Sequence, residues 1–206
     1  MYSTALKRKA PVLYAEDKTR KNPFKILVFT MLSARTKDAT TIKVVNHLFA
    51  MAATPKAIRA LGQKQLEKIL YGVGFYRTKT KHLLEMCKIL QDGTIPNTLE
   101  KLLELQGVGR KTANIVLARA FNQKTLGVDV HVHRISNRLG LVKTKKPEET
   151  EIALLKILPS KHIRKFNRNF VAFGQTVCLP RNPDCSHCPL EKLCPKQGVV
   201  RKIINK

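Results

Sequence analysis

Acidic residues are scarce in this 206-residue chain, which carries 14 Asp and Glu against 39 Lys and Arg and a formal charge of +25. Self-repulsion of this size must be offset, and a polyanionic partner is the simplest way to do so. A hyperthermophile surface would enrich Glu together with Lys, which this sequence does not. The shortage of acids therefore favours a nucleic acid over an anionic membrane, since no basic amphipathic stretch stands apart from the core pattern.

Long hydrophobic runs are absent as well. No apolar stretch reaches the roughly 18 residues that a transmembrane helix needs. The first residues, "MYSTALKRKAP", lack the apolar core of a secretory signal. We therefore expect no membrane partner. We also expect a monomer, located in the cytoplasm in association with the nucleoid, or in the nucleus or mitochondrion if the source is a eukaryote.

The cysteines do not form a disulfide framework, because their number, five, is odd and they are unevenly spread along the chain. Cys87 stands alone among apolar neighbours and is expected in the core. The other four have the spacing C-x6-C-x2-C-x5-C, at Cys178, Cys185, Cys188 and Cys194. Such a group indicates a metal site in a reducing compartment. Four thiolates suit either zinc or an iron–sulfur cluster, and the spacing alone does not decide between them.

No convincing strand hairpin occurs, and helix signals recur throughout, which predicts an all-α fold with roughly eight to ten short helices. Asn22-Pro23 and Thr54-Pro55 read as helix starts, Asp38 as an N-cap, and Gly62 as a helix end. The chain is more basic and less regular towards both ends. We therefore expect a helical domain over 22–126 and a discontinuous domain built from 1–21 and 127–206.

The stretch "LQGVGRKTAN" places Gly107, Val108 and Gly109 directly before two cations, Arg110 and Lys111. Two glycines let the backbone take positive φ and approach another molecule closely. The amides at the start of the following helix have no partner within that helix, and the helix dipole favours an anion there. The pattern predicts a helix–hairpin–helix that clamps one phosphate of DNA without reading sequence. A plain turn between two helices is the alternative.

"LQGVGRKTAN" followed by "GVDVHVHR", with "NPFKILVFTMLSARTKD" before it and the cysteine group after it, resembles the endonuclease III family of DNA glycosylases. The resemblance runs from Asn22 to Cys194. It implies a six-helix barrel domain with the hairpin and a second domain that carries a [4Fe–4S] cluster on the four cysteines. It also implies that Lys111 is the nucleophile and that Asp129 completes the catalytic site.

Chemistry gives independent support for these two roles. Cleavage of a glycosidic bond builds positive charge on the sugar, which a carboxylate such as Asp129 can stabilise. A neutral lysine amine can attack C1′ and form a Schiff base. The alternatives are a phosphate contact for Lys111 and an N-cap of the helix that begins at Val130 for Asp129, and the capping role is compatible with catalysis.

The resemblance also implies that two loops fill the gap left when a base is extruded, through Arg35 in "MLSAR" and Phe75 after the first glycine pair. Arg35 stands where the family usually has glutamine, which leaves the opposite-base preference open. A core aromatic is the alternative for Phe75. Tyr76, Arg77 and Lys79, together with Lys81, are expected to add contacts to the DNA backbone.

These features together predict a bifunctional DNA glycosylase and AP lyase of base excision repair. Its substrate would be double-stranded DNA with damaged, oxidised pyrimidines or abasic sites, and strand cleavage would proceed by β-elimination. A mismatch-specific glycosylase is one alternative, although Lys111 argues against it. A catalytically silent, metal-containing DNA-binding module is the other.

Overall fold

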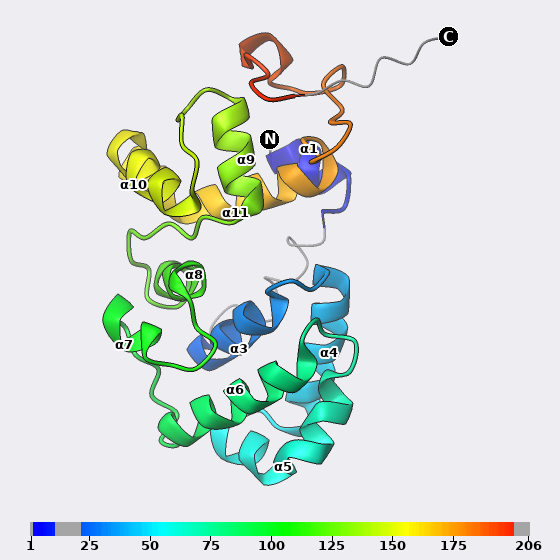
Figure 1. Cartoon of the computed structure of the whole chain (residues 1–206), viewed down its shortest axis with the longest axis vertical. Coiled ribbons are helices and arrows are strands. Elements are labelled where there is room, and N and C mark those ends of the chain that lie inside the picture. Colours follow the sequence, from blue (N-terminus) through cyan, green and yellow to red (C-terminus); the bar gives the residue numbers. More distant parts are fainter. Residues whose placement is uncertain (1, 11–21, 200–206) are drawn as a thin grey trace. The chain divides into compact units, whose positions relative to one another are not determined.

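The computed structural model describes residues 2–10 and 22–199, and within these ranges the chain is helical and contains no strand (Figure 1). These residues form ten α-helices and one 3₁₀ helix: α1 (Tyr2–Lys7), α3 (Pro23–Ser33), α4 (Asp38–Met51), α5 (Pro55–Leu70), α6 (Tyr76–Ile89), α7 (Leu99–Leu103), α8 (Arg110–Ala120), α9 (Val130–Arg138), α10 (Pro147–Ile157), α11 (Ser160–Thr176) and η1 (Glu191–Leu193). The all-α prediction is confirmed, and the number of helices falls within the expected range.

The chain divides into two compact units. One unit, called here the central unit, spans Ala15–Thr125 and holds α3 to α8. The other, called the terminal unit, combines Met1–Tyr14 with Leu126–Lys206 and holds α1, α9 to α11 and the cysteine-containing loop.

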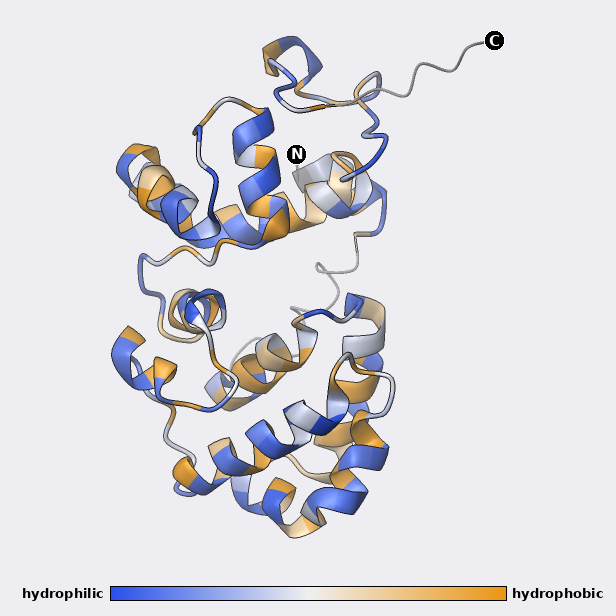
Figure 2. Cartoon of the chain, in the orientation of Figure 1, coloured by the Kyte–Doolittle hydropathy of each residue, from blue (hydrophilic) through white to orange (hydrophobic). Residues whose placement is uncertain are grey.

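The core of the central unit is built around α3, in which eight of the eleven residues are buried. This helix packs against α4, α6 and α8. The surrounding helices are amphipathic, and blue and orange segments alternate along α5 and α6 in Figure 2. At the start of α3, the Asn22 side chain accepts a hydrogen bond from the Lys25 amide at 3.1 Å, and Pro23 is the first helical residue, so the predicted start is confirmed.

One predicted helix boundary needs correction, and two others are confirmed. Asp38 is the first residue of α4 rather than its N-cap, because Lys37 holds the extended backbone conformation that a cap requires. Gly62, with φ 67° and ψ 171°, interrupts the helical geometry within α5, so the helix that starts at Pro55 ends there as predicted and a second helical segment continues to Leu70. The Thr54 side chain caps α5 as predicted, accepting from the Ala57 amide at 3.2 Å.

A buried lysine joins α6 to the end of α3. The Lys79 ammonium donates hydrogen bonds to the carbonyls of Leu32 at 2.8 Å and Ala34 at 2.5 Å, and to Thr36 Oγ1 at 3.3 Å. Only 8% of Lys79 is exposed, and burial lowers its pKa to about 8. The expected contact between Lys79 and the DNA backbone is therefore wrong, because its charged end is enclosed by the loop after α3.

The terminal unit has its own apolar core, to which α9, α10 and α11 all contribute. The short helix α1 packs against α11 through small side chains, since Ala5, Ala10 and Ala172 are all fully buried. Small residues allow two helices to approach closely, so α1 is held near the C-terminal end of α11. There, Thr176 accepts a hydrogen bond from Arg8.

A substitution at Gly74, in the loop between α5 and α6, tests how tightly this loop packs against the loop that follows α3. A Cβ added at Gly74 would collide with the backbone carbonyl of Arg35, which cannot swing aside as a side chain can. We expect Gly74→Ala to lower the free energy of unfolding by about 1–3 kcal/mol, the usual cost of overpacking. Urea denaturation measures this. The matched variant Gly109→Ala, where φ is −93° and nothing lies within 4 Å of the added atom, should lose less than about 1 kcal/mol.

Candidate functional site

The predicted helix–hairpin–helix consists of α7, a turn over 104–109 and α8. The turn is closed by hydrogen bonds from the Leu105 amide to Leu102 and from the Val108 amide to Leu105, at 3.3 and 3.0 Å. Leu105 and Val108 are buried in the same core as Val116 of α8, which fixes the two helices against each other. Gly107, Gly109 and Arg110 remain exposed, and an open hollow lies over the turn. The tip of the hairpin is thus a rigid and accessible stretch of backbone.

The two glycines of this turn serve different purposes. Gly107 has φ +79°, and a Cβ at this position would lie 2.8 Å from Nδ1 of His82 on α6. Gly109 has φ −93°, which any residue can adopt, so the expectation of positive φ at this second glycine is wrong. Since nothing lies within 4 Å of a Cβ added at Gly109, the protein itself does not require a glycine there.

Helix α8 begins without a capping side chain, because its N-cap residue is Gly109. Arg110 is exposed, whereas Lys111, in the same first turn, is half-buried. The first amides of a helix have no partner within it, and they carry the positive end of the helix dipole. This end of α8 therefore combines backbone donors, two cations and an exposed turn, which suits an anion such as a phosphate.

Asp129 lies in the terminal unit, where it is the N-cap of α9. Its Oδ1 atom accepts hydrogen bonds from the amides of His131 and Val132, both at 2.9 Å. The capping role considered from the sequence is confirmed. Two bonds to one oxygen fix the orientation of the carboxylate, as a stabilising group in a reaction requires.

Arg35 and Phe75 are brought together by the loops that follow α3 and α5. Both have left-handed backbones, with φ of 53° and 58°. The Arg35 guanidinium lies 5.5 Å from the centre of the Phe75 ring, in a cation–π contact. Phe75 is 63% exposed, so the core alternative for this residue is wrong. The Gly74 amide and the Lys79 ammonium both bond to Thr36 Oγ1, and they thereby hold the two loops together.

The four clustered cysteines line one cavity in the terminal unit, together with apolar residues such as Ile135, Phe173 and Val177. Two sulfur atoms accept backbone hydrogen bonds at 3.4 Å, Cys188 from the Leu190 amide and Cys194 from the Lys196 amide. Burial raises the pKa of the Cys188 thiol, and the nearby Cys178 adds to the rise. Several such thiols become thiolates together only when a cation compensates their charge.

Four cysteines are the donor set of two kinds of metal centre. Within the described residues, no three metal-binding side chains converge closely enough to hold a single ion. A tetrahedral zinc would draw all four sulfurs to about 2.3 Å from one point. An iron–sulfur cluster instead binds each cysteine to a different iron and needs a wider cavity. The donor set of four cysteines suits either centre, and the cavity around it is lined largely by apolar residues.

Two arginines of α9 attach the start of this cysteine loop. Arg138 is 7% exposed and donates to the sulfur of Cys178 at 3.4 Å and to the carbonyls of Leu179 and Pro180 at 2.6 and 2.9 Å. Arg134 donates to the carbonyls of Cys178 and Gly174. These contacts give Arg134 a structural role.

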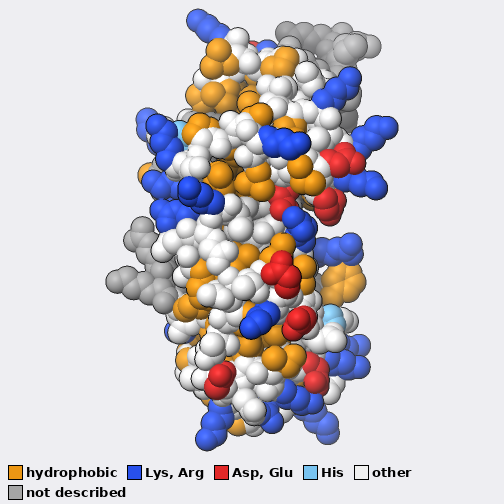
Figure 3. Space-filling view, turned by 90° about the vertical axis from the view of Figure 1, so that its left-hand side faces the viewer, with side chains coloured by type: hydrophobic (Ala, Val, Ile, Leu, Met, Phe, Trp, Pro, Cys, Tyr) orange, Lys and Arg blue, Asp and Glu red, His pale blue; other side chains and the backbone are white. Residues whose placement is uncertain are grey.

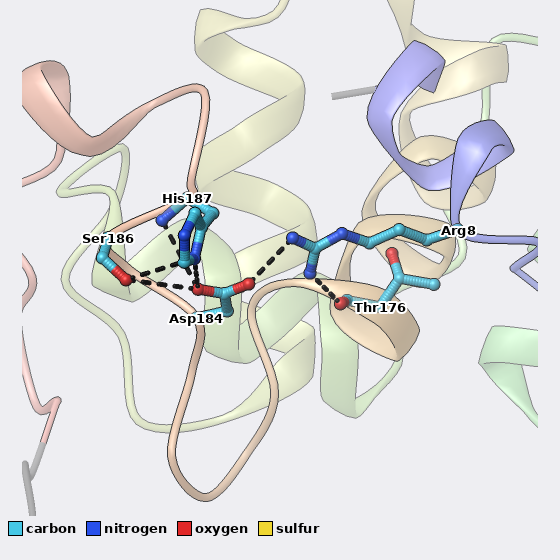
Figure 4. A network of polar contacts seen from close by, with 5 residues as sticks. All are labelled: Arg8, Thr176, Asp184, Ser186 and His187. Carbon is cyan, nitrogen blue, oxygen red and sulfur yellow. Dashed lines mark hydrogen bonds and ion pairs between the residues drawn. The ribbon is translucent and has the colours of Figure 1, made fainter.

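A third arginine reaches the loop from the N-terminal segment (Figure 4). Arg8 donates to the carbonyl of Thr176 at 2.9 Å and to the carboxylate of Asp184 at 2.8 Å. The same carboxylate accepts from Nδ1 of His187 at 2.8 Å, and these hydrogen bonds, from His187 first and then Arg8, lower the pKa of Asp184 to about 2. The side chain of His187 is 76% exposed, so this residue lies at the surface.

On the face of the molecule drawn in Figure 3, lysine and arginine side chains lie mainly along the margins, and several acidic side chains lie between them. No helix in the described part of the chain is long and apolar enough to cross a membrane. Cys87 is fully buried in the core of the central unit, as expected, and burial raises the pKa of its thiol to about 12.

Residues 28–160 match the family described as HhH-GPD superfamily base excision DNA repair protein. Endonuclease III of Thermotoga maritima is 46% identical over 176 residues, which cover 84% of this chain and 83% of that protein. The chain belongs to the endonuclease III family. It is a DNA glycosylase of base excision repair, in a family for which AP lyase activity is typical and which carries a [4Fe–4S] cluster.

An animal protein and two solved protein–DNA complexes are also similar to this chain. The Gallus gallus endonuclease III-like protein 1 is 40% identical over 178 residues, which cover 84% of this chain and 63% of that protein. A solved structure of a trapped endonuclease III–DNA covalent intermediate matches with a TM-score of 0.81 and 32% identity, over 93% of this chain and 96% of that one. A non-covalent endonuclease III–DNA complex matches equally well, with a TM-score of 0.81. These complexes support DNA as the partner of this chain.

The hairpin offers a way to separate folding from binding. Gly107→Ala introduces a collision with His82 at a positive φ, so both the stability and the affinity for DNA should fall. Gly109→Ala should leave the melting temperature within a few degrees of the wild type but weaken binding to abasic DNA on the order of tenfold, because the new methyl group obstructs the approaching phosphate. Fluorescence anisotropy and thermal melts measure the two effects. Unchanged binding by Gly109→Ala would show that the backbone of this turn does not approach DNA.

Proposed function

We propose that this protein is a bifunctional DNA glycosylase and AP lyase that removes oxidised pyrimidines from double-stranded DNA and acts as a monomer. The observation that carries the proposal is the half-buried Lys111 in the first turn of α8, directly behind an exposed turn suited to a phosphate. The turn proposed to bind the DNA backbone and the amine proposed to react are thereby separated by only one or two residues. The covalent endonuclease III–DNA intermediate supports a reaction of this kind.

The proposed reaction begins at C1′ of the damaged nucleotide. The neutral amine of Lys111 forms a bond to C1′ while the glycosidic bond breaks, and the base leaves with the bonding electrons and takes up a proton. The sugar ring then opens to give a Schiff base. Loss of a proton from C2′ expels the 3′ phosphate by β-elimination, which cleaves the strand. Water finally releases the lysine.

Asp129 is proposed to stabilise the positive charge that develops on the sugar while the glycosidic bond breaks. The two amide hydrogen bonds of the α9 cap hold its carboxylate in one orientation. The fixed carboxylate need not reorganise during the reaction, which is the main advantage of a preorganised charge.

Contacts with DNA are assigned to two parts of the central unit. The turn at Gly107, Val108 and Gly109, with Arg110, would hold a phosphate through backbone amides and charge. Arg35 and Phe75 would fill the space that an extruded base leaves, since they are exposed, stacked on each other and held by tightly packed loops. A preformed pair loses little conformational freedom on insertion.

The cofactor is proposed to be a [4Fe–4S] cluster held by Cys178, Cys185, Cys188 and Cys194. When bound, it would supply four cysteine–iron bonds that tie together a loop with little core of its own. The protein contributes the apolar lining of the cavity and hydrogen bonds to the sulfur atoms, including one from Arg138. Its role is structural, since it fixes the loop on which the exposed Arg181 lies.

Borohydride trapping on duplexes with an oxidised pyrimidine tests the assignment of the nucleophile. Lys111→Gln should abolish trapped adducts and strand cleavage but leave binding to abasic DNA nearly intact. Arg110→Gln is the matched control and should weaken binding while cleavage persists at saturating enzyme. If Lys111→Gln still forms adducts at the wild-type rate, the nucleophile is another residue.

The carboxylate is tested by two substitutions at one position. Asp129→Asn keeps an oxygen that caps α9 nearly as well as aspartate, yet it removes the charge. We expect base release to slow on the order of a hundredfold with little change in the melting temperature. Asp129→Ala should show the same slowing and also lose about 1 kcal/mol of stability. Equal rates for Asp129→Asn and the wild type would remove Asp129 from the reaction.

Elemental analysis of protein purified without oxygen tests the cofactor. About four iron atoms and a similar amount of sulfide should accompany each chain, as a cubane cluster requires. Cys188→Ser should lower the iron content and the visible absorbance together. Protein that holds about one zinc and no iron would contradict the proposal.

A further inference from the structure

The cysteine loop has few means of holding its own shape. Between α11 and the end of the loop at Cys194, its regular structure is the three-residue 3₁₀ helix η1, and none of the residues in that helix is buried. A loop of this kind depends on contacts from elsewhere in the chain. The polar contacts of Arg8 come from a segment about 170 residues away in sequence.

The position of Arg8 is fixed by the way α1 ends. The Ala10 amide donates to the carbonyl of Ala5 at 3.1 Å, and the Lys9 amide donates to Leu6 at 3.0 Å. Lys9 has φ 52°, so α1 ends in a Schellman motif in which Arg8 is the C-cap. Ala5 and Ala10, which the motif brings together, are the residues buried against Ala172 of α11. The same packing that anchors α1 therefore aims Arg8 at the loop.

Arg8 connects two fixed points. One guanidinium nitrogen donates to the carbonyl of Thr176, the last residue of α11, and another donates to Asp184, the residue before Cys185. Each bond involves a charged donor, and the Arg8 and Asp184 side chains are only 34% and 30% exposed. Charge-assisted bonds of this kind are shorter and stronger than neutral ones.

Asp184 passes this constraint on to the turn that contains two of the four cysteines. Its Oδ1 atom accepts from the His187 ring and, more weakly, from the His187 amide at 3.4 Å (Figure 4). The same turn is closed by the Cys188 amide, which donates to Cys185 at 3.2 Å. The carboxylate thus joins Arg8 on one side to the Cys185–Cys188 turn on the other.

We propose that α1 acts as a latch on the metal centre, with Arg8 as a positioning residue that holds the Cys185–Cys188 turn in its ligating shape. This inference rests on the proposed metal site but concerns a different part of the chain. An opened turn would let one or two cysteines leave the metal. The latch therefore governs how slowly the metal is lost, without touching the metal or the DNA.

The test compares four versions of the full-length holoprotein: wild type, Arg8→Met, Asp184→Asn and the double variant. Methionine keeps the apolar stem of Arg8, and asparagine keeps an oxygen for the His187 amide. Lys7→Met is the matched control, because it removes one exposed charge from the same helix. Iron release into an excess of ferrous chelator is followed by the loss of visible absorbance, alongside a circular-dichroism melt.

We expect Arg8→Met to release iron about two- to fivefold faster than the wild type, the scale of one partly exposed ion pair. Asp184→Asn should show a similar increase, and the double variant no more than either single one, since all three break one connection. Lys7→Met should match the wild type. Equal release from Arg8→Met and the wild type would overturn the latch, as would an increase that follows only a lower melting temperature.

Hydrogen–deuterium exchange gives a second readout that does not depend on which metal is bound. In each protein as purified, Arg8→Met should speed exchange in a peptide covering 180–190 and leave peptides of α9 and α10 unchanged. Zinc in place of iron would contradict the cofactor, while faster exchange confined to 180–190 would still support the latch. Unchanged exchange in that peptide would reject the latch even if iron is found.

Discussion

Every α-helix ends in four carbonyls that have no partner within the helix, and much of this protein's tertiary structure follows from how those carbonyls are satisfied. The end of α3 shows this. Thr30 accepts from the Ser33 hydroxyl, Met31 from the Ala34 amide and Ser33 from the Thr36 amide. The carbonyl of Leu32 receives the ammonium of Lys79, from another helix. The need to satisfy the last carbonyls of α3 thereby holds α6 in place, together with the loops that carry Arg35 and Phe75.

The last carbonyls of α11 also accept hydrogen bonds from side chains elsewhere in the chain. Arg134 of α9 donates to the carbonyl of Gly174, and Arg8, just beyond α1, donates to that of Thr176. Both guanidiniums then continue into the cysteine loop, to Cys178 and Asp184. An arginine has five donors in a rigid fork, so it can close a helix end and hold a neighbouring loop at once. The cysteine loop is therefore attached to the helix ends as well as to the apolar core, against which Cys178, Cys188 and Leu190 pack.

The N-terminal ends of α8 and α9 differ in whether a side chain caps them, and this difference bears on function. Asp129 caps α9 with its own carboxylate, which leaves that charge oriented and immobile. Helix α8 has Gly109 at the same position and so provides no side chain to occupy its positive end. A capped end suits a group that must stay fixed during a reaction, and an end without a capping side chain suits an external anion. The two proposed roles follow from what each helix start contains.

The sequence predicted the features that depend on neighbours in the chain. These include the all-α fold, the caps at Asn22 and Thr54, and the family, because their patterns are local or have a characteristic spacing. It misplaced Lys79, because a lysine beside other cations on a helix looks exposed until the end of α3 is known to lie against it. It could not indicate the bond between Arg8 and Asp184, which depends on the packing of small residues of α1 on α11. The negative φ of Gly109 was missed because two glycines in one turn read alike.

The formal charge of +25 takes on a different meaning once these contacts are known. Lys79 and Arg138 are buried, and both are committed to carbonyls of the protein itself. Arg8 and Arg134 are likewise engaged with helix ends and the cysteine loop. Such cations release no counterions when DNA binds, since only charges that neutralise phosphates do so. The excess of lysine and arginine thus serves two purposes, one inside the fold and one at its surface, and sequence composition alone assigns all of it to the second.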